Sequence, residues 1–312
     1  MKFLVVGNGG REHAIASSLK KSSMVSRLFW TPGNAATGEI AENPGIASED
    51  FESLLQFARK ENIDITVVGP EVPLVNGMAD LFQEHGLKVF GPKTDGAKIE
   101  GSKIFAKQLM KACNIPTAPF REFYRLEPAL KYLKKASPPF VVKADGLAAG
   151  KGVIIAHDMP EAQKALVDMF ENKKFGDSGT RVVIDGYMEG EEATVLALYD
   201  GRNILPLISS QDHKPVFDGD KGPNTGGMGA VAPAPVVTSG VREKVNERVL
   251  IPLTREFKER NIDYRGVIYV GLMIQEQEPY VLEFNCRLGD PEAEAVMPLL
   301  QSDFGSMVAC TV

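Results

Sequence analysis

The sequence predicts an α/β fold in its first part, with a doubly wound parallel sheet, followed by a unit of mixed α+β type. Short apolar runs alternate with helical segments over about the first 95 residues, which is typical of an open, doubly wound sheet. After Gly91-Pro92 the pattern changes to strands joined by hairpins and glycine-rich loops. The length of 312 residues suggests about two domains, at roughly 150 residues each.

In the first part each expected strand leads into a helix. Residues 2–6 (KFLVV) are a continuous apolar run, as in a strand that is buried on both faces. Ile15 and Leu19 have the spacing of one helix face, which predicts a helix over 11–21. The remaining expected elements are strands at 28–30, 63–68 and 88–90 and helices at 51–60 and 78–85.

The second part is expected to begin with a helix at 102–113, which Ser102 caps. Residues 192–212 are rich in strand formers. Residues 213–235, rich in Gly, Pro, Asn and Asp, predict a long irregular loop, which in a compact protein is usually functional or disordered. The other expected elements are helices at 127–135, 160–172 and 241–260, strands at 140–143, 153–156 and 181–185, and a hairpin of 266–275 with 279–285.

Composition excludes several classes of protein. The net charge of −6 argues against a broad surface for nucleic acid or for an anionic membrane. The three cysteines lie far apart, with neither zinc-ligand spacing nor an even count for a disulfide framework. The apolar run at the N-terminus is too short for a signal peptide, and no later run reaches about 18 residues. We expect a soluble cytoplasmic protein.

A glycine turn follows the first strand, at Gly7-Asn8-Gly9-Gly10. A dinucleotide fingerprint would need glycine at position 12, where Glu12 stands, and the ribose-binding acid about 20 residues further on is also missing. Two hypotheses remain. The turn offers its backbone N–H groups to a small phosphate, or it is a tight strand-to-helix turn without a ligand.

The strongest local signal is the stretch VVKADGLAAGKGV at 141–153. It is not a Walker A loop, because the glycine spacing is wrong and a strand rather than a helix follows. Small residues nevertheless let backbone N–H groups approach phosphate oxygens, and Lys143 at the strand end supplies a fixed positive charge. The alternative is a plain surface hairpin, which would not need a lysine at the strand end.

A second signal lies in the last hairpin strand. Side chains alternate along a strand, so Glu283, Asn285 and Arg287 are expected to share one face. A carboxylate and an amide oxygen two residues apart suit Mg²⁺, and the arginine suits a phosphate or acyl-phosphate oxygen. The alternative is a half-exposed strand with a salt bridge. The opposite face is expected to carry Leu282, Phe284 and Cys286.

Two further stretches are weaker signals. Residues 182–192 join two strands, and such a hinge can offer backbone groups to an adenine edge and an acid to a ribose, although its glutamates can equally be solvated. Residues 211–214 and 222–229 flank the expected loop. Neither forms a nucleophile–base triad, and no GxSxG or HExxH motif occurs, which argues against serine hydrolases and zinc proteases.

With these motifs the chain resembles the glycinamide ribonucleotide synthetase family, which belongs to the ATP-grasp superfamily. The resemblance implies an N-terminal α/β domain at 1–100 and a two-part ATP-grasp unit at 101–312, with 118–188 as its smaller lid subdomain. The family continues with a C-terminal lobe that is absent here, which leaves a surface for a partner or for self-association. The matching stretches are GNGGREHA (7–14), VGPEVPLVNG (68–77), EGSKIFAK (100–107), KADGLAAGKGV (143–153), SQDHK (210–214), GPNTGGMGA (222–230) and EFNCRLGDPE (283–292).

The resemblance implies an ATP-dependent carboxylate–amine ligase of purine biosynthesis that uses Mg²⁺ or Mn²⁺. ATP phosphorylates the carboxylate of glycine, and the amino group of 5-phosphoribosylamine attacks the glycyl phosphate to give glycinamide ribonucleotide, ADP and phosphate. Positioning and charge neutralisation suffice for this chemistry, in agreement with the missing triad. The alternative is an inactive or partner-dependent ATP-binding fragment of such a ligase.

The resemblance also implies roles for single residues. Lys143, Arg287 and Asp290 are the expected catalytic residues, and Glu283 and Asn285 the metal ligands. The expected ATP-binding residues are Lys103, Lys143, Gly146, Ala149, Gly150, Lys151, Gly152, Asp185, Gly186, Met188 and Glu192. The expected substrate-binding residues are Gly9, Gly10, Glu12, Asp212, Lys214, Asn224, Gly226, Gly227 and Met228. Gly186 departs from the family, which commonly has an acid there, so only its backbone can take part.

Overall fold

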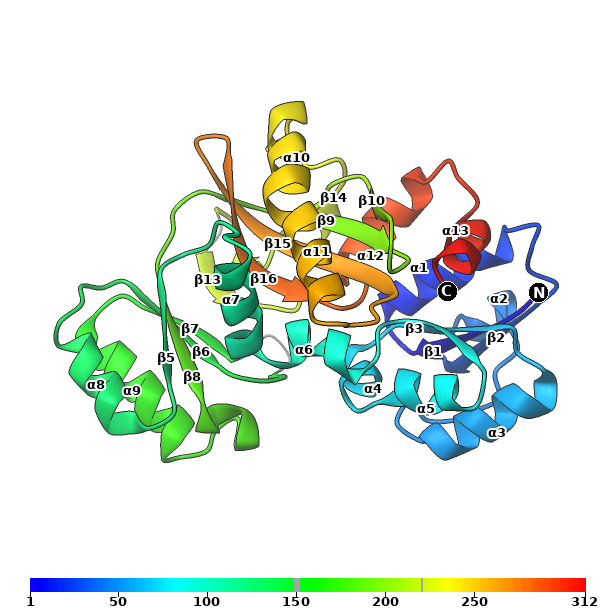
Figure 1. The fold of residues 1–312 in the computed structure, drawn as a ribbon, viewed down its shortest axis with the longest axis horizontal. Helices are drawn as coiled ribbons and strands as arrows, with labels where there is room; N and C mark the ends of the chain where they lie inside the picture. Colours follow the sequence, from blue (N-terminus) through cyan, green and yellow to red (C-terminus); the bar gives the residue numbers. More distant parts are fainter. Residues whose placement is uncertain (149–151, 220) are drawn as a thin grey trace.

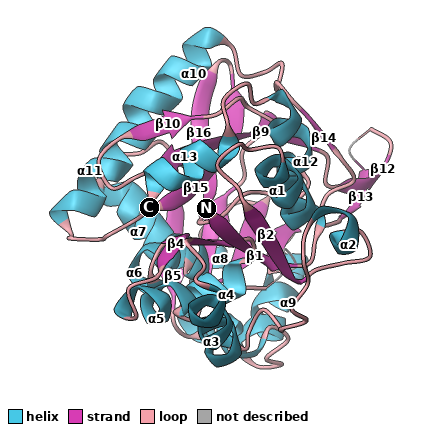
Figure 2. Cartoon of the chain, turned by 90° about the vertical axis from the view of Figure 1, so that its right-hand side faces the viewer, coloured by secondary structure: helices cyan, strands magenta, loops and turns pink. Residues whose placement is uncertain are grey.

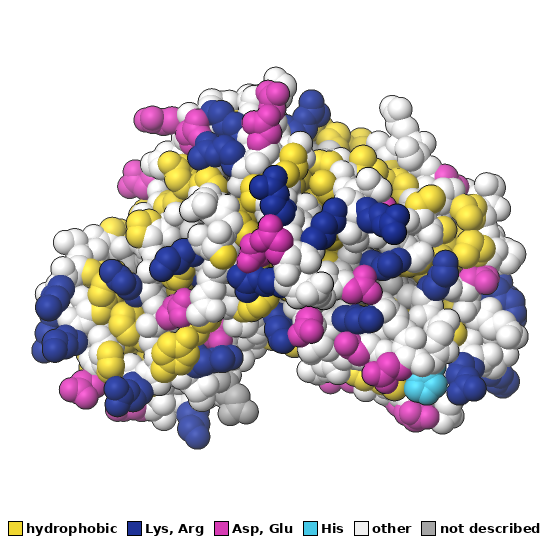
Figure 3. Space-filling view, in the orientation of Figure 1, with side chains coloured by type: hydrophobic (Ala, Val, Ile, Leu, Met, Phe, Trp, Pro, Cys, Tyr) yellow, Lys and Arg dark blue, Asp and Glu magenta, His cyan; other side chains and the backbone are white. Residues whose placement is uncertain are grey.

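The computed structural model describes residues 1–148, 152–219 and 221–312. Three four-stranded sheets organise these described residues, and we call them the N-terminal sheet, the lid sheet and the central sheet. Figure 1 shows the lid sheet with α8 and α9 at one end of the molecule and the N-terminal sheet at the other, with the central sheet between them behind α10 and α11. The two ends form separate lobes along the lower edge of the molecule, and on this face acidic and basic side chains are interspersed (Figure 3).

The N-terminal sheet is parallel throughout, in the order β2-β1-β3-β4, and confirms the predicted doubly wound domain. Phe3 and Val5 pack in one core with Ile15 of α1, while Leu4 and Val6 pack in the core on the other face. Figure 2 shows α1 on one side of this sheet and α3 and α5 on the other. The elements are β1 (Lys2–Gly7), α1 (Gly10–Lys20), β2 (Arg27–Pro32), α2 (Thr37–Ile40), α3 (Phe51–Glu61), β3 (Ile65–Val68), α4 (Glu71–Val75), α5 (Met78–Glu84), β4 (Lys88–Phe90) and α6 (Thr94–Gly101).

The lid sheet is antiparallel, in the order β5-β8-β6-β7. Two helices pack against it and enclose a core of their own, which includes Leu133, Val142 and Leu166. Because this core is separate from the other two, the lid sheet forms a distinct packing unit. Its elements are β5 (Phe120–Phe123), α8 (Leu126–Leu133), β6 (Phe140–Ala144), β7 (Val153–Ala156), α9 (Met159–Phe170), a short 3₁₀ helix (Gly176–Thr180) and β8 (Val182–Gly186).

The central sheet is antiparallel, in the order β10-β9-β15-β16. The single helix predicted over 241–260 is helical along its length, with a π-helical turn in its middle. The elements are α7 (Lys103–Ala112), β9 (Glu191–Tyr199), β10 (Ile204–Pro206), α10 (Ser239–Val245), the π-helical turn (Asn246–Leu250), α11 (Ile251–Glu259), β15 (Gly266–Gln275), β16 (Glu278–Asn285), α12 (Glu292–Val296), a 3₁₀ turn (Met297–Leu299) and α13 (Phe304–Thr311).

The irregular loop expected over 213–235 contains short strands. β12 (Pro215–Phe217) and β13 (Lys221–Asn224) form a hairpin, and β11 (Gln211–Asp212) pairs with β14 (Ala230–Val231). The prediction of irregular structure was wrong for these segments, which are too short for an alternation of side chains to mark them in the sequence. None of the helices that the structure describes combines the length and hydrophobicity required to cross a membrane.

A bulge in β16 also corrects the predicted alternation. Gly271 pairs with Glu283 and Leu272 pairs with Val281, so Leu282 is an extra residue between the two pairs. Val281 and Phe284 are therefore both buried, whereas Leu282 is only partly buried instead of sharing the core face with Phe284. A bulge re-aims the side chains that follow it, and here it sets the face of Glu283.

Candidate active site

Two lysines from different elements converge on one buried carboxylate. The ammonium of Lys143, at the end of β6, lies 2.8 Å from Asp185 Oδ2, and that of Lys107, from α7, lies 2.9 Å from the same oxygen. Lys143 also donates a hydrogen bond to the carbonyl of Leu282 in the β16 bulge, at 3.3 Å. Lys143 is thus held between the lid sheet and the central sheet, in the place expected for a fixed cation.

Lys103 lies close to the same point. Its ammonium donates to the carbonyl of Gly146, at 3.2 Å, from the first turn of α7. Burial lowers the pKa of Lys103, while the nearby carboxylate of Glu283 opposes that shift and Lys143 adds to it. The start of the 145–152 loop is anchored here as well, because Asp145 accepts hydrogen bonds from Ser102 Oγ and from the backbone of Ile104.

Glu283 and Asn285 lie together on β16, where the amide of Asn285 donates weakly to Glu283 Oε1, at 3.4 Å. Burial alone would raise the pKa of Glu283, but Lys214, Lys103 and Lys143 together hold it below its usual value, so the side chain is a carboxylate at neutral pH. This oxygen pair fits a hard divalent cation. No cluster of three or more His, Cys, Asp and Glu side chains suited to a metal occurs among the described residues, so phosphate and water oxygens would have to complete the shell.

Lys214 connects the predicted substrate and ribose residues. Its ammonium lies 2.9 Å from Glu192 and 3.2 Å from Asp212. Although burial opposes it, these two carboxylates and Glu283 raise the pKa of Lys214 above its usual value. Lys214 therefore stays charged and brings Asp212, Glu192 and Glu283 to one place. In this structure Glu192 is paired with the lysine.

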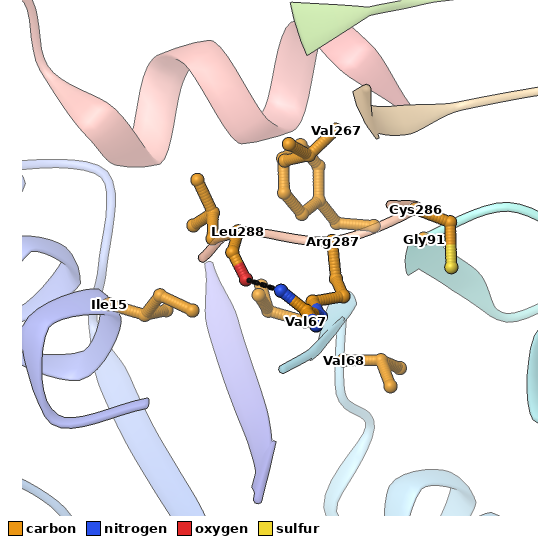
Figure 4. Close-up of a pocket in the computed structure, with 9 residues that line it drawn as sticks. Ile15, Val67, Val68, Gly91, Val267, Cys286, Arg287 and Leu288 are labelled. Carbon is orange, nitrogen blue, oxygen red and sulfur yellow. Dashed lines mark hydrogen bonds between the residues drawn. The ribbon is translucent and has the colours of Figure 1, made fainter. Parts of the chain in front are cut away.

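Arg287 is held by two acids from the N-terminal domain. Its guanidinium lies 2.9 Å from Glu100 and 3.3 Å from Glu71. It also donates to the carbonyl of Leu288, at 3.2 Å (Figure 4). The cavity beside it measures about 10 Å³, which is at most one water, so it is not a ligand site. These donors are used within the protein, and a catalytic role for Arg287 stays a prediction.

A larger cavity of about 490 Å³, between α6, α7 and Tyr124, is lined by none of the predicted site residues.

The structure brings Asp290 to the glycine turn. Asp290 accepts a hydrogen bond from the backbone N–H of Arg11, at 3.3 Å, and a Cβ on Gly10 would clash with the carboxylate of Glu294. Glu12 turns back on the loop, where one oxygen accepts from the N–H of Gly9, at 2.6 Å, and the other pairs with Arg11, at 2.6 Å. Carboxylates of the protein thus accept from the N–H groups of Gly9 and Arg11 in this structure, and both hypotheses for the turn stay open.

For the remaining predicted site residues, the structure gives only a backbone contact, an exposure or a position in the chain. The N–H of Gly186 donates to the carbonyl of Pro119, at 2.8 Å, and Gly152 accepts from Ala144, also at 2.8 Å. Met228 is 60% exposed in the loop after β13, next to Gly226 and Gly227. Met188 lies in the hinge loop between β8 and β9. Ala149, Gly150 and Lys151 lie outside the described residues, as does the side chain of Asn224, whose backbone ends β13.

Two domain families match the chain in succession. The one described as "Phosphoribosylglycinamide synthetase, N domain" matches residues 1–100, and "Phosphoribosylglycinamide synthetase, ATP-grasp (A) domain" matches residues 101–293. Together they cover nearly the whole chain.

The chain belongs to the phosphoribosylglycinamide synthetase family.

Curated members of this family have the name phosphoribosylamine–glycine ligase. The protein from Escherichia coli K12 is 49% identical over 97% of this chain and 71% of its own length, and that from Allochromatium vinosum is 51% identical over 97% and 72%. The crystal structure of the Thermotoga maritima ligase superposes with a TM-score of 0.85 at 34% identity, over 99% of this chain and 74% of that one. D-alanine–D-alanine ligase from Bacillus anthracis, at 20% identity and a TM-score of 0.68, shares the fold. The resemblance inferred from the motifs is confirmed, and the chain is an ATP-grasp ligase that acts on small-molecule substrates.

Sequence reasoning missed three residues that organise this site. Lys107 and Thr117 contact each other and connect Asp185 to β16, and Glu100 holds Arg287. For Lys107 a signal was present, since it follows Lys103 by four residues and so lies on the same face of the helix. Glu100 stands in the matching stretch 100–107, but no local pattern assigns a role to it or to Thr117, because their partners are distant in sequence.

Proposed function

We propose that this protein ligates glycine to 5-phosphoribosylamine with ATP. The name of its relatives gives the two substrates, and the ATP-grasp domain indicates the nucleotide. The observation that carries the proposal is the convergence of Lys103, Lys143 and Glu283 on one point between the lid sheet and the central sheet, in a chain that matches both domains of the family. A chain that only binds ATP is the weaker candidate, because the substrate residues Asp212 and Lys214 contact the same cluster.

The proposed reaction has two steps. An oxygen of the glycine carboxylate attacks the γ-phosphorus of ATP, and the bond to the bridging oxygen breaks and releases ADP. The amine nitrogen of 5-phosphoribosylamine then attacks the carbonyl carbon of glycyl phosphate. The C–O bond to phosphate breaks, phosphate leaves, and the nitrogen loses a proton to give the amide. No side chain forms a bond, so the protein contributes positioning and charge.

We assign the nucleotide phosphates to Lys103 and Lys143, and the base and ribose to residues 185–188 and Glu192. Glycine and 5-phosphoribosylamine are assigned to the space bounded by the glycine turn, Asp212, Lys214 and residues 224–228, with Asp290 beside it. Glu283 and Asn285 would hold Mg²⁺, with Mn²⁺ as a substitute. When bound there, the cation would neutralise charge on phosphate oxygens.

We further propose two domains, 1–100 and 101–312, with 118–188 as the lid, and a cytoplasmic location that suits three unpaired cysteines.

The decisive experiment is ADP release by the purified 312-residue chain, with each co-substrate omitted in turn. We expect release only when glycine, 5-phosphoribosylamine and Mg²⁺ are all present with ATP. Equal release without glycine would contradict the proposal, and ATP binding without any release would favour the ATP-binding fragment.

A further inference from the structure

A closed circuit of polar contacts runs between the lid sheet and the central sheet. Lys107 donates to Thr117 Oγ1, at 2.8 Å, and Thr117 donates to the carbonyl of Val281, at 2.6 Å. On its other side Lys107 pairs with Asp185, which pairs with Lys143. Lys143 donates to the carbonyl of Leu282, the neighbour of Val281 in the β16 bulge. The chain of contacts therefore starts and finishes at adjacent residues of β16.

Lys107 is not placed to touch a nucleotide itself. It is 2% exposed, and its ammonium is engaged by Asp185 and Thr117. Burial lowers the pKa of Lys107 to about 8, opposed by Asp185, so keeping a charge at this position is costly. An apolar side chain of similar length would fill the same space without that desolvation penalty. The charge therefore needs a reason other than packing.

The charge balance of the cluster supplies one. Asp185 is 3% exposed, and both ammonium groups approach the same oxygen, Oδ2. With both lysines charged, the group of three carries a net charge of +1. With Lys143 and Asp185 alone the net charge would be zero, and the carboxylate would cancel the field of the lysine at the phosphates. Coulomb interactions at these distances are strong in a buried site.

We propose that Lys107 is a positioning residue for ATP: it neutralises Asp185 and holds it in place, so that Lys143 keeps its positive charge available to the nucleotide phosphates beside Glu283. The inference rests on the proposed function, because it assigns the phosphates to Lys143. It goes beyond that function in giving a role to a residue that does not touch the ligand.

The test is calorimetric binding of ATP with Mg²⁺ to the full chain, with ADP release measured in parallel. We expect Lys107→Met to weaken ATP binding about tenfold, or about 1.4 kcal/mol, and to raise the KM for ATP without changing the KM for glycine. Lys107→Arg, which keeps the charge, should recover part of the loss. The matched control is Lys111→Met, since Lys111 is exposed on the same helix, and it should leave binding unchanged.

A double variant separates charge from packing. Adding Asp185→Asn to Lys107→Met returns the net charge of the three-residue cluster to +1, carried by Lys143. The double variant should therefore bind ATP more tightly than Lys107→Met alone. Should Lys107→Met fail to fold, Lys107→Arg compared with Lys107→Gln gives the same contrast, with the glutamine variant binding more weakly. Unchanged ATP affinity in Lys107→Met, or a double variant no better than the single one, would overturn the inference. Tight ATP binding by the wild type without ligation would overturn the proposed function alone.

Discussion

At Glu283 a single carboxylate lies among three lysines. Lys214, Lys103 and Lys143 all lower its pKa, against the effect of burial. The carboxylate is therefore charged and is compensated by the protein even before a ligand binds. The residue next to it, Leu282, contributes its carbonyl to Lys143, so the predicted metal ligand and the predicted phosphate cation are aligned by the same bulge. At the residue scale, the bulge places Lys143 and Glu283 beside the same short stretch of β16.

Glu283→Gln tests this arrangement. The amide keeps the shape of the side chain but removes the charge that a divalent cation prefers, so we expect the Mg²⁺ concentration for half-maximal ADP release to rise at least about tenfold. The midpoint of urea unfolding should also fall, because the three lysines lose the charge that compensates them. Glu276→Gln, at the exposed tip of the same hairpin, is the matched control. An unchanged Mg²⁺ dependence in Glu283→Gln would remove this residue from the metal site.

Glu294 predicts a pH dependence of stability. Burial and the neighbouring Asp290 raise the pKa of Glu294 to about 7. The folded protein then binds a proton that the unfolded chain has already lost above its ordinary pKa of about 4.5. The stabilisation is complete below pH 4.5 and is lost as the pH rises through about 7.

In Glu294→Gln this titration disappears. Relative to the variant, the wild type should lose about 1 kcal/mol of unfolding free energy between pH 5 and pH 8, after allowance for solvent at the partly exposed side chain. Urea unfolding at both pH values measures the difference. Glu243→Gln, at an exposed position of α10, should show no such change. Parallel pH profiles for wild type and Glu294→Gln would refute the assignment.

At the scale of elements, the start of α7 joins two units. Ser102 is the N-cap of the helix, where its hydroxyl oxygen accepts from the N–H of Phe105, at 3.1 Å, and donates to Asp145 of the lid loop, at 2.9 Å. Asp145 in turn lies 2.9 Å from Arg181, before β8. One side chain thus caps the start of α7 and anchors the loop that follows Lys143.

Ser102→Ala should cost about 1–2 kcal/mol, because it removes a helix cap and leaves the buried Asp145 with one donor fewer. The free energy of unfolding in urea measures it. Ser239→Ala is the control, since Ser239 is exposed at the first position of α10, and its effect should stay within about 0.5 kcal/mol. Equal effects of the two substitutions would show that Ser102 adds nothing beyond ordinary helix propensity.

At the scale of the whole molecule, a partly buried charge network connects the N-terminal domain to the segment that follows β16. Glu71 begins α4 and Glu100 lies in α6, and both pair with Arg287, which follows β16. Burial raises the pKa of Glu100, an effect that Arg287 opposes. Arg11 meets the same segment from α1 by donating to the carbonyl of Leu288, at 3.2 Å. The two parts of the chain are therefore joined by charge as well as by apolar packing.

Arg287→Met should destabilise the protein by about 3–5 kcal/mol, because it leaves Glu100 buried without its partner. Adding Glu100→Gln should recover part of that loss. Trp30 is the only tryptophan and is fully buried in the N-terminal sheet, so its fluorescence in urea reports unfolding of that domain. Arg265→Met, which breaks an exposed pair with Asp263, is the control. Full stability with lost ligation in Arg287→Met would instead favour the catalytic role.

The amino-acid sequence by itself determined the doubly wound domain, the order of the main strands and helices, and the family. These depend on apolar periodicity, turn residues and motifs within short stretches of chain, such as KFLVV and the residues around Lys143. It also singled out Lys103, Lys143, Glu283 and Asn285, which the structure brings together, while their roles stay predictions.

Only the tertiary structure decided which partner each buried charge has. Lys107 with Asp185, and Arg287 with Glu71 at a separation of 216 residues, have no local signature. The bulge at Leu282 and the hairpin in residues 215–224 were likewise invisible, because backbone pairing leaves little trace in side-chain patterns. The reason is physical: periodicity records which face of an element is apolar, whereas a buried charge is satisfied by whichever opposite charge the packing of separate elements places within a few ångströms.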